Sequence, residues 1–193
     1  MIKEDNMSQN LQGNEGENPF QSNLNPAYTF ENLIKSSSNK FAYEVAEMTA
    51  HNLGDRKNNP LIIYSAPGLG KTRLLHAIGN EILRANLLAR VLYISSEEFF
   101  KEYVQALQNK ETDNFREKFS ALDVLLMDDI QFFSNKPATL LQFAYTIRVL
   151  IEQGRQVVLS LDKSPLKLGW NEKISALLVS GVIAEIEDTK LRC

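Results

Sequence analysis

The sequence predicts an α/β fold in which helices flank a parallel sheet of five strands. Two observations lead to this prediction. Five short runs have continuous apolar centres, and segments with a helical hydrophobic period separate them. Strands of this composition are buried on both faces, because the crossover helices of a parallel sheet cover both sides. The five runs are residues 61–64, 90–95, 123–129, 156–162 and 182–186.

Length and composition indicate one globular domain with a tail. The chain has 193 residues, of which 44% are apolar and 23% are charged, and both fractions are ordinary for a globular protein. The net charge of −3 argues against a large basic surface for duplex DNA. The single cysteine, Cys193, provides no disulfide framework. We expect a cytoplasmic protein that does not enter a membrane, because no apolar run reaches the ~18 residues of a membrane span.

The N-terminal residues differ from the rest of the chain. Residues 1–24 are rich in Asn, Gln, Glu, Ser and Gly and show no hydrophobic period. We therefore expect a disordered polar tail or linker there and a folded core at 25–193. Within this core, Ser38 or Asn39 is expected to cap a helix that runs to about Leu53.

The first strand leads into the most informative motif of the chain. Residues 61–64 open into a glycine-containing loop at 65–70, which is followed by Lys71, Thr72 and a helical pattern. Strand, loop, Lys-Thr and helix in this order are typical of the phosphate-binding loop (P-loop) of nucleoside triphosphatases. Backbone N–H groups of such a loop converge on the phosphates, and the start of the helix adds free N–H donors and its positive dipole end.

This motif predicts a site for ATP or ADP with Mg²⁺. Lys71 would supply a mobile cation that faces solvent until nucleotide binds, and the Thr72 hydroxyl would ligate Mg²⁺. The motif usually has glycine at the position of Ser65, and serine adopts positive φ less freely. The nucleotide-binding residues that we predict are Gly68, Leu69, Gly70, Lys71 and Thr72.

Strands and helices continue to alternate after the P-loop. Helical patterns are expected at 97–108, 137–153 and 173–179, with a further short helix in the charged link 109–118. The pattern at 137–153 has proline near its first turn and Gly154 just past its end, an arrangement that natural helices favour. His51 and His76 lie in helical patterns without partners at the spacing of metal ligands, so we assign them to surface or packing positions.

Acidic residues follow two other predicted strands at the edge where a nucleotide would bind. Ligands of parallel sheets lie outside the carboxyl ends of the strands. Asp128 and Asp129 end the apolar run VLLM; we expect Asp128 to hold Mg²⁺ through water and Asp129 to orient or activate the attacking water. Asp162 ends the fourth strand. Two interpretations of Asp162 stay open: a group that reaches the γ-phosphate or the water, or an aspartate that only forms a turn.

Six segments of the chain carry a more specific signal than the P-loop alone. They are NPAYTFENLI, SSNKFA, NPLIIYSAPGLGKTRLLHAIGNEI, VLYISSEEF, VQALQNKETDNFREKF and DVLLMDDIQFFSNK, of which DDIQFF is the most specific. These segments resemble the bacterial replication initiator DnaA family, and the resemblance covers residues 25 to about 192. It implies an AAA+ core that binds ATP or ADP tightly and hydrolyses ATP slowly. In the family, ATP-bound subunits oligomerise at the replication origin and melt DNA.

The chain also departs from the family pattern. The family's GGVGLGKT reads SAPGLGKT here. Val104 and Lys136 match family positions that face single-stranded DNA, whereas a basic residue of that surface aligns with Ala138. The arginine that reaches a neighbouring subunit's ATP aligns with Leu177. The resemblance stops before the family's helical lid and its C-terminal helix-turn-helix domain. It therefore implies weak binding of single-stranded DNA at most, and no sequence-specific binding of duplex DNA.

The leading hypothesis is a truncated DnaA-like protein that acts in the initiation or regulation of DNA replication. It would bind ATP or ADP with Mg²⁺ and would hydrolyse ATP slowly at most, because Leu177 cannot stabilise the transition state of a neighbour. The alternative is a regulatory interaction module, with nucleotide as a structural ligand and no turnover. That module would dock on a full-length initiator or on a replicative helicase. A helicase loader ranks below both, since DDIQFF and NPAYTF are more typical of initiators.

Overall fold

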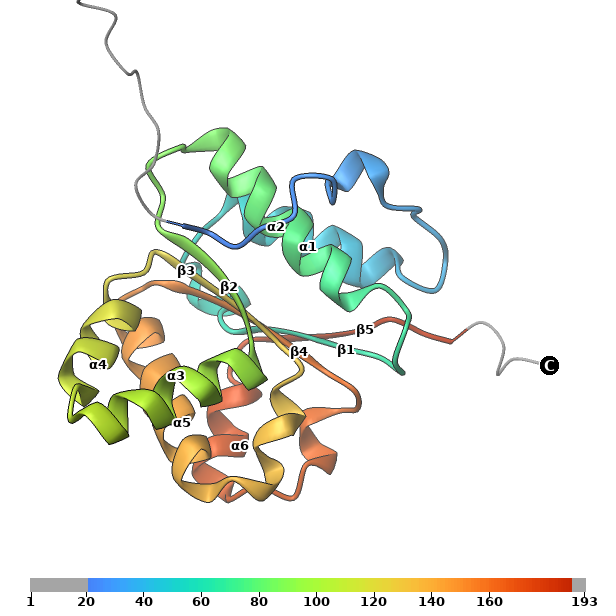
Figure 1. The fold of residues 1–193 in the computed structure, drawn as a ribbon. Coiled ribbons are helices and arrows are strands. Elements are labelled where there is room, and N and C mark those ends of the chain that lie inside the picture. The colour runs from blue at the N-terminus through green and yellow to red at the C-terminus, as the bar shows by residue number, and fades with distance from the viewer. Residues whose placement is uncertain (1–20, 189–193) are drawn as a thin grey trace, which may run out of the picture.

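The structure is a computed structural model, and it describes residues 21–188. At its centre lies a sheet of five parallel strands in the order β2-β3-β4-β1-β5 (Figure 1). The strands are β1 Leu61–Tyr64, β2 Val91–Ser95, β3 Val124–Asp128, β4 Gln156–Leu161 and β5 Val182–Glu185. The predicted α/β class and the predicted five-stranded parallel sheet are confirmed.

Helices cover both faces of this sheet (Figure 1). Two of them, α1 Lys40–His51 and α2 Lys71–Ala85, pack on one face. The other face carries α3 Ser96–Asn109, α4 Thr112–Ser120, α5 Pro137–Glu152 and α6 Glu172–Leu178. Successive strand residues point to opposite faces, so Leu61 and Ile63 join the core under α1 and α2, whereas Ile62 joins the other core. Burial on both faces explains why the strands are mainly apolar, with polar residues at their ends and at Ser160.

Two helix starts differ in how well the local sequence predicts them. α3 begins with a capping box, in which the Ser95 hydroxyl accepts the Glu98 N–H and the Glu98 carboxylate accepts the Ser95 N–H. Asn39 directly precedes α1, as predicted, but its side chain does not cap the helix. It accepts the Ser36 N–H and donates to the Ile34 carbonyl oxygen. The predicted side-chain cap is therefore wrong, because this asparagine fastens the preceding turn instead.

The chain contacts the sheet before residue 25. The Tyr93 N–H donates to the Ser22 carbonyl oxygen over 2.9 Å, and Leu24 packs on the core under α1 and α2. Gly79 of α2 makes room for this packing, since a Cβ there would lie 2.6 Å from a Leu24 methyl group. The predicted tail at 1–24 falls mainly on residues outside the described range. Its last four residues, 21–24, belong to the folded part.

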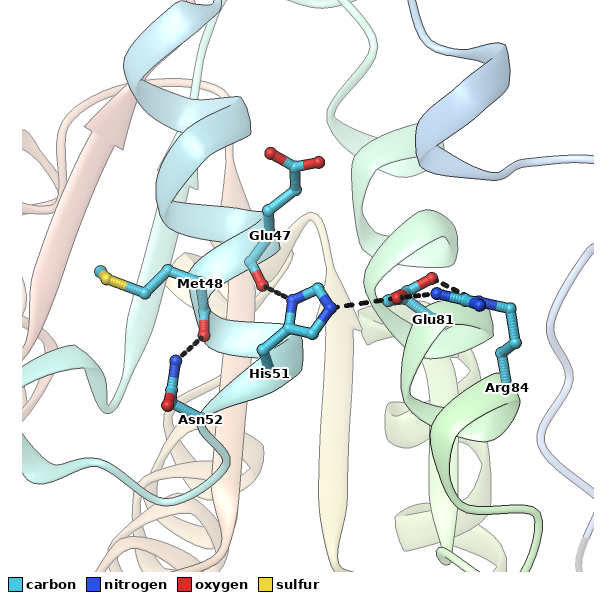
Figure 2. Close-up of polar contacts among 6 residues, drawn as sticks. All are labelled: Glu47, Met48, His51, Asn52, Glu81 and Arg84. Carbon is cyan, nitrogen blue, oxygen red and sulfur yellow. Dashed lines mark hydrogen bonds and ion pairs between the residues drawn. The ribbon is translucent and has the colours of Figure 1, made fainter.

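His51 joins α1 to α2 at the surface (Figure 2). Its Nδ1 lies 2.7 Å from the Glu47 carbonyl oxygen, and its Nε2 lies 3.2 Å from a carboxylate oxygen of Glu81. Arg84 also hydrogen-bonds to Glu81, and this bond is the main reason that the pKa of Glu81 is lowered. His51 thus occupies a surface position, in agreement with the prediction. None of the helices within residues 21–188 has both the length and the apolar composition that crossing a bilayer requires.

Candidate nucleotide-binding site

The P-loop, residues 65–70, joins β1 to α2 at the carboxyl edge of the sheet. Gly68 (φ +84°) and Gly70 (φ +95°) have left-handed backbones, which glycine adopts without a steric penalty. Ser65 is not among the described residues with positive φ, so this position does not require glycine here. Its side chain is buried, and its hydroxyl donates to the Ala66 carbonyl oxygen. The departure from the usual motif therefore fits the loop.

The Lys71 side chain lies back across this loop. Its ammonium group donates to the Ser65 carbonyl oxygen over 3.0 Å and to the Ser65 hydroxyl over 3.3 Å, and it lies 3.4 Å from the Ala66 carbonyl oxygen. Only 7% of the residue is exposed. The expectation that Lys71 faces solvent is therefore wrong. Three oxygens of Ser65 and Ala66 thus satisfy the ammonium group in the absence of an anion.

Asp128, the last residue of β3, is the most densely bonded carboxylate of the site. It is buried, and its Oδ2 accepts the Thr72 hydroxyl over 2.6 Å and the Tyr93 hydroxyl over 3.1 Å. Its Oδ1 accepts the Ser160 hydroxyl. Its backbone carbonyl oxygen accepts the Ser96 hydroxyl over 2.8 Å. Three strands and the first turn of α2 thus converge on one acidic side chain.

Thr72 and Asp128 fit a Mg²⁺ ion. In nucleotide sites Mg²⁺ takes one or two protein oxygens together with phosphate and water oxygens. A hydroxyl and a carboxylate are oxygen ligands, and the two are already in contact here. The polar groups on the Asp128 carboxylate, among the described residues, are neutral hydroxyls, because Lys71 binds the loop instead. A buried carboxylate without a charged partner favours a cation beside it.

The other two predicted acids lie close to this pair. Asp129 has a left-handed backbone (φ +57°), and its N–H donates to the Ser160 hydroxyl over 2.9 Å. Gln131 bridges the two acids: its amide donates to the Asp129 carboxylate over 3.0 Å and accepts the Asp162 N–H over 3.2 Å. One carboxylate oxygen of Asp162, Oδ1, is buried and has no hydrogen-bond partner within residues 21–188.

A cavity of about 420 Å³ brings these predicted residues together. Six of its lining residues were predicted from the sequence: Gly68, Gly70, Lys71, Thr72, Asp129 and Asp162. Tyr28, Arg73 and Gln131 also line it, and the sequence analysis did not single them out. Arg73 follows the Lys-Thr pair directly, and its guanidinium group lies 5.3 Å from the Tyr28 ring centroid. The position of Arg73 beside the motif was a signal that could have identified it.

Leu69 lines a second cavity that also borders the P-loop. This cavity has a volume of about 520 Å³ and shares Gly68, Gly70 and Arg73 with the first. Its remaining walls carry polar side chains, such as Asn32 and Asn39, as well as apolar ones, and come from the segment before α1, from α1 and α2, and from the chain after β5. They include Leu33, Tyr43, Leu74 and Ile186. The P-loop therefore borders two cavities, which share Gly68, Gly70 and Arg73.

Tyr93, Ser160 and the role of His76 in this site were not predicted from the sequence. The His76 ring is buried and lies 3.9 Å from the Tyr93 ring, centroid to centroid. Its Nδ1 accepts the Asn25 N–H over 3.1 Å. Burial lowers the pKa of His76, and the negative charge of Asp128 opposes this only in part. Burial, together with Asp128, raises the pKa of Tyr93, which keeps its hydroxyl protonated as a donor.

Val104, Lys136 and Leu177, which align with the family's DNA-facing positions and with its arginine that reaches a neighbouring subunit's ATP, do not line the first cavity. Val104 is half-exposed on α3. The Lys136 ammonium lies 3.6 Å from the Phe132 ring centroid and donates to the Phe132 carbonyl oxygen. Leu177 lines an apolar groove of about 480 Å³ between α5 and α6, together with Leu141, Tyr145 and Ile174.

Known proteins resemble this chain in sequence and in fold. The family model for the bacterial DnaA ATPase domain matches residues 24–185. The chromosomal replication initiator protein DnaA of Citrifermentans bemidjiense is 44% identical over 166 residues, which cover 86% of this chain and 36% of that protein. Domain III of the Thermotoga maritima replication initiation protein DnaA is 37% identical, with a TM-score of 0.82 over 85% of this chain and 68% of that chain.

A further solved structure carries ligands. It is a replication initiator DnaA bound to AMPPCP and single-stranded DNA, 37% identical, with a TM-score of 0.81 over 86% of this chain and 52% of that chain. The chain thus spans 36% of the length of the curated relative and about half of this ligand-bound structure. The sequence match, the shared fold and the P-loop geometry agree with one another, and the chain belongs to the bacterial DnaA ATPase domain family.

Proposed function

We propose that this chain binds ATP or ADP together with Mg²⁺ and acts in the cytoplasm, in the initiation or regulation of DNA replication. The observation that carries this proposal is the contact between the Thr72 hydroxyl and the Asp128 carboxylate, 2.6 Å apart beside the P-loop. The relative bound to AMPPCP supports the choice of nucleotide. ATP hydrolysis is slow at most in this proposal.

Each part of the site has a role in this proposal. The N–H groups of the P-loop and of the first turn of α2 bind the phosphates, and Lys71 exchanges its loop oxygens for phosphate oxygens. Thr72 and Asp128 hold Mg²⁺, which offsets the negative charge of the phosphates. Asp129 accepts a proton from the attacking water and orients it. Asp162, whose Oδ1 is buried without a hydrogen-bond partner among residues 21–188, binds that water or the end of the triphosphate.

The two cavities divide the nucleotide between them. The first cavity, with Lys71, Asp129 and Asp162, takes the phosphates. The second cavity takes the base, because the apolar side chains of Leu33, Tyr43 and Ile186 suit its flat ring and the polar groups of Asn32 and Asn39 suit its polar edge. A nucleotide bound in this way passes across Gly68 and Gly70, where the absence of side chains lets it approach the backbone.

Leu177 is the reason to expect slow turnover. The family resemblance aligns this position with the arginine that reaches a neighbouring subunit's ATP, and an arginine of this kind contributes about 10³-fold or more to such reactions. A leucine in an apolar groove cannot offset the charge of a transferring phosphoryl group. The same groove favours the second candidate function, a regulatory module that docks on a full-length initiator or a replicative helicase without turnover.

Nucleotide retention tests the proposal. The purified protein is incubated with radiolabelled ATP or ADP, with Mg²⁺ or with EDTA, and the nucleotide retained per subunit is measured. We expect retention of both nucleotides, and more with Mg²⁺ than with EDTA. Retention at the level of a protein without a P-loop would contradict the proposal. Retention of ATP without phosphate release at any protein concentration would favour the regulatory module.

A further inference from the structure

Tyr93 links the sheet to the metal-binding carboxylate, and no step of the proposed reaction uses it. It lies on β2, next to β3, and its hydroxyl donates to Asp128 Oδ2 over 3.1 Å. The same oxygen accepts the Thr72 hydroxyl, whereas Oδ1 accepts the Ser160 hydroxyl. Two tethers from neighbouring strands, Tyr93 on β2 and Ser160 on β4, therefore hold one oxygen each of this carboxylate.

These two tethers fix the plane of the carboxylate. The carboxylate of an aspartate can rotate about the Cβ–Cγ bond, and that rotation would turn Oδ2 of Asp128 away from Thr72. With Ser160 on one oxygen and Tyr93 on the other, rotation would break two hydrogen bonds. Such bonds to a charged group contribute more than bonds between neutral groups. The Asp128 oxygen that meets Thr72 is thus held where both groups can face one ion.

The Tyr93 ring is itself held on several sides. It stacks on the His76 ring, with the centroids 3.9 Å apart and the planes inclined by 33°. Its backbone N–H donates to the Ser22 carbonyl oxygen. His76 in turn accepts the Asn25 N–H. These contacts fix the position of the ring, and with it the direction in which the hydroxyl points toward the Asp128 carboxylate.

We propose that Tyr93 is a positioning residue for the Mg²⁺ site. Its hydroxyl orients Asp128, and its ring packs on His76. This inference rests on the proposed function, since it assigns Asp128 to Mg²⁺. Partners that orient a metal-binding carboxylate set the metal affinity, and their loss weakens it by roughly 10- to 100-fold. The lower end applies to Tyr93, because Ser160 and Thr72 remain on the carboxylate when the tyrosine hydroxyl is removed.

The test is the Mg²⁺ dependence of ATP binding by Tyr93→Phe. Phenylalanine keeps the ring on His76 and removes only the hydroxyl. The matched control is Tyr64→Phe, which also removes a tyrosine–carboxylate bond, that of the Tyr64 hydroxyl to Glu185 over 2.7 Å. Equilibrium binding of a fluorescent ATP analogue is measured in EDTA and along a Mg²⁺ titration. Thermal unfolding without nucleotide reports whether each variant is folded.

In EDTA, we expect Tyr93→Phe to bind ATP with the affinity of the native protein. In the Mg²⁺ titration, it should require about 10-fold more Mg²⁺ to reach its full ATP affinity. Tyr64→Phe should follow the native curve throughout. An unchanged Mg²⁺ midpoint in Tyr93→Phe would overturn the inference and leave the proposed function intact. An equal loss of affinity in EDTA and in Mg²⁺ would also overturn it, because the hydroxyl would then act on the fold or on the nucleotide. A native protein indifferent to Mg²⁺ would overturn both.

Discussion

The Thr72 hydroxyl donates to the Asp128 carboxylate over 2.6 Å, which joins the first turn of α2 to the end of β3. These residues are 56 positions apart in the chain. Their contact places the residue that follows the P-loop lysine against the first acid of the DDIQFF segment. The two predicted metal ligands are therefore already in contact, and the backbone need not move to bring them together.

This contact predicts that Thr72→Ala weakens the Mg²⁺-dependent part of ATP binding. Alanine removes the hydroxyl ligand, so we expect a loss of about 10-fold or more when Mg²⁺ is present, and little change in EDTA. Thr72→Ser is the matched control, since serine keeps a hydroxyl at the same place. Equilibrium binding with and without Mg²⁺ measures both variants. Equal affinity of Thr72→Ala and Thr72→Ser in Mg²⁺ would argue against Thr72 as a ligand.

A second prediction concerns the pH dependence of stability. The folded-state pKa of His76 lies below its ordinary value of 6.5, because burial disfavours the charged form. The unfolded chain therefore binds a proton more readily, and His76 makes stability fall as the pH drops below about 6.5. His76→Gln cannot titrate but keeps an acceptor for the Asn25 N–H.

The comparison is made by urea unfolding at about pH 7.5 and about pH 5.5. The native protein should lose more stability between these two values than His76→Gln. Carboxylates titrate in both proteins, so the difference between them isolates His76. A native protein and a variant with the same acid sensitivity would rule out a buried neutral His76.

A third prediction concerns hydrolysis. Because Leu177 provides no cation to a neighbour, phosphate release per subunit should be very slow and should not rise with protein concentration. Asp129→Asn should lower even this residual rate while ATP affinity is retained, since Asp129 acts on water and not on phosphate. Asp113→Asn, an exposed acid on α4 paired with Arg116, serves as the control. A rate that climbs with concentration would identify another cation, such as Lys173 or Arg148, as the group that reaches the neighbour.

A fourth prediction concerns DNA. The net charge of −3 leaves little attraction for phosphates, so this 193-residue chain should not bind a defined duplex with sub-micromolar affinity at physiological salt. Binding of single-stranded DNA should be weak, and Lys136→Ala should reduce its salt slope by about 1 at most, because the ammonium already lies over the Phe132 ring. Fluorescence anisotropy of labelled oligonucleotides measures both. Tight duplex binding would show that a basic surface is present after all.

The sequence predicts well those parts of the fold that depend only on residues close together in the chain. The apolar strands, the P-loop and the acids at the ends of β3 and β4 are each contained in a short segment. Such a segment can be recognised without knowledge of the rest of the fold. Tyr93 and Ser160 were missed because their importance depends on strand order: both matter only because β2 and β4 flank β3. Lys71 was placed in solvent because the sequence does not reveal which loop oxygens are free to accept its ammonium group.

Lys71→Ala tests most directly whether the P-loop is the nucleotide site. ATP affinity is measured at equilibrium for the native protein, for Lys71→Ala and for the control Lys57→Ala. Lys57 is exposed and lies before the start of β1, whereas the P-loop follows the end of that strand. Charge-assisted hydrogen bonds to phosphate are lost only in the first variant, so we expect its affinity to fall by about 100-fold and Lys57→Ala to bind like the native protein. A Lys71→Ala variant that binds ATP as tightly as the native protein would contradict the site.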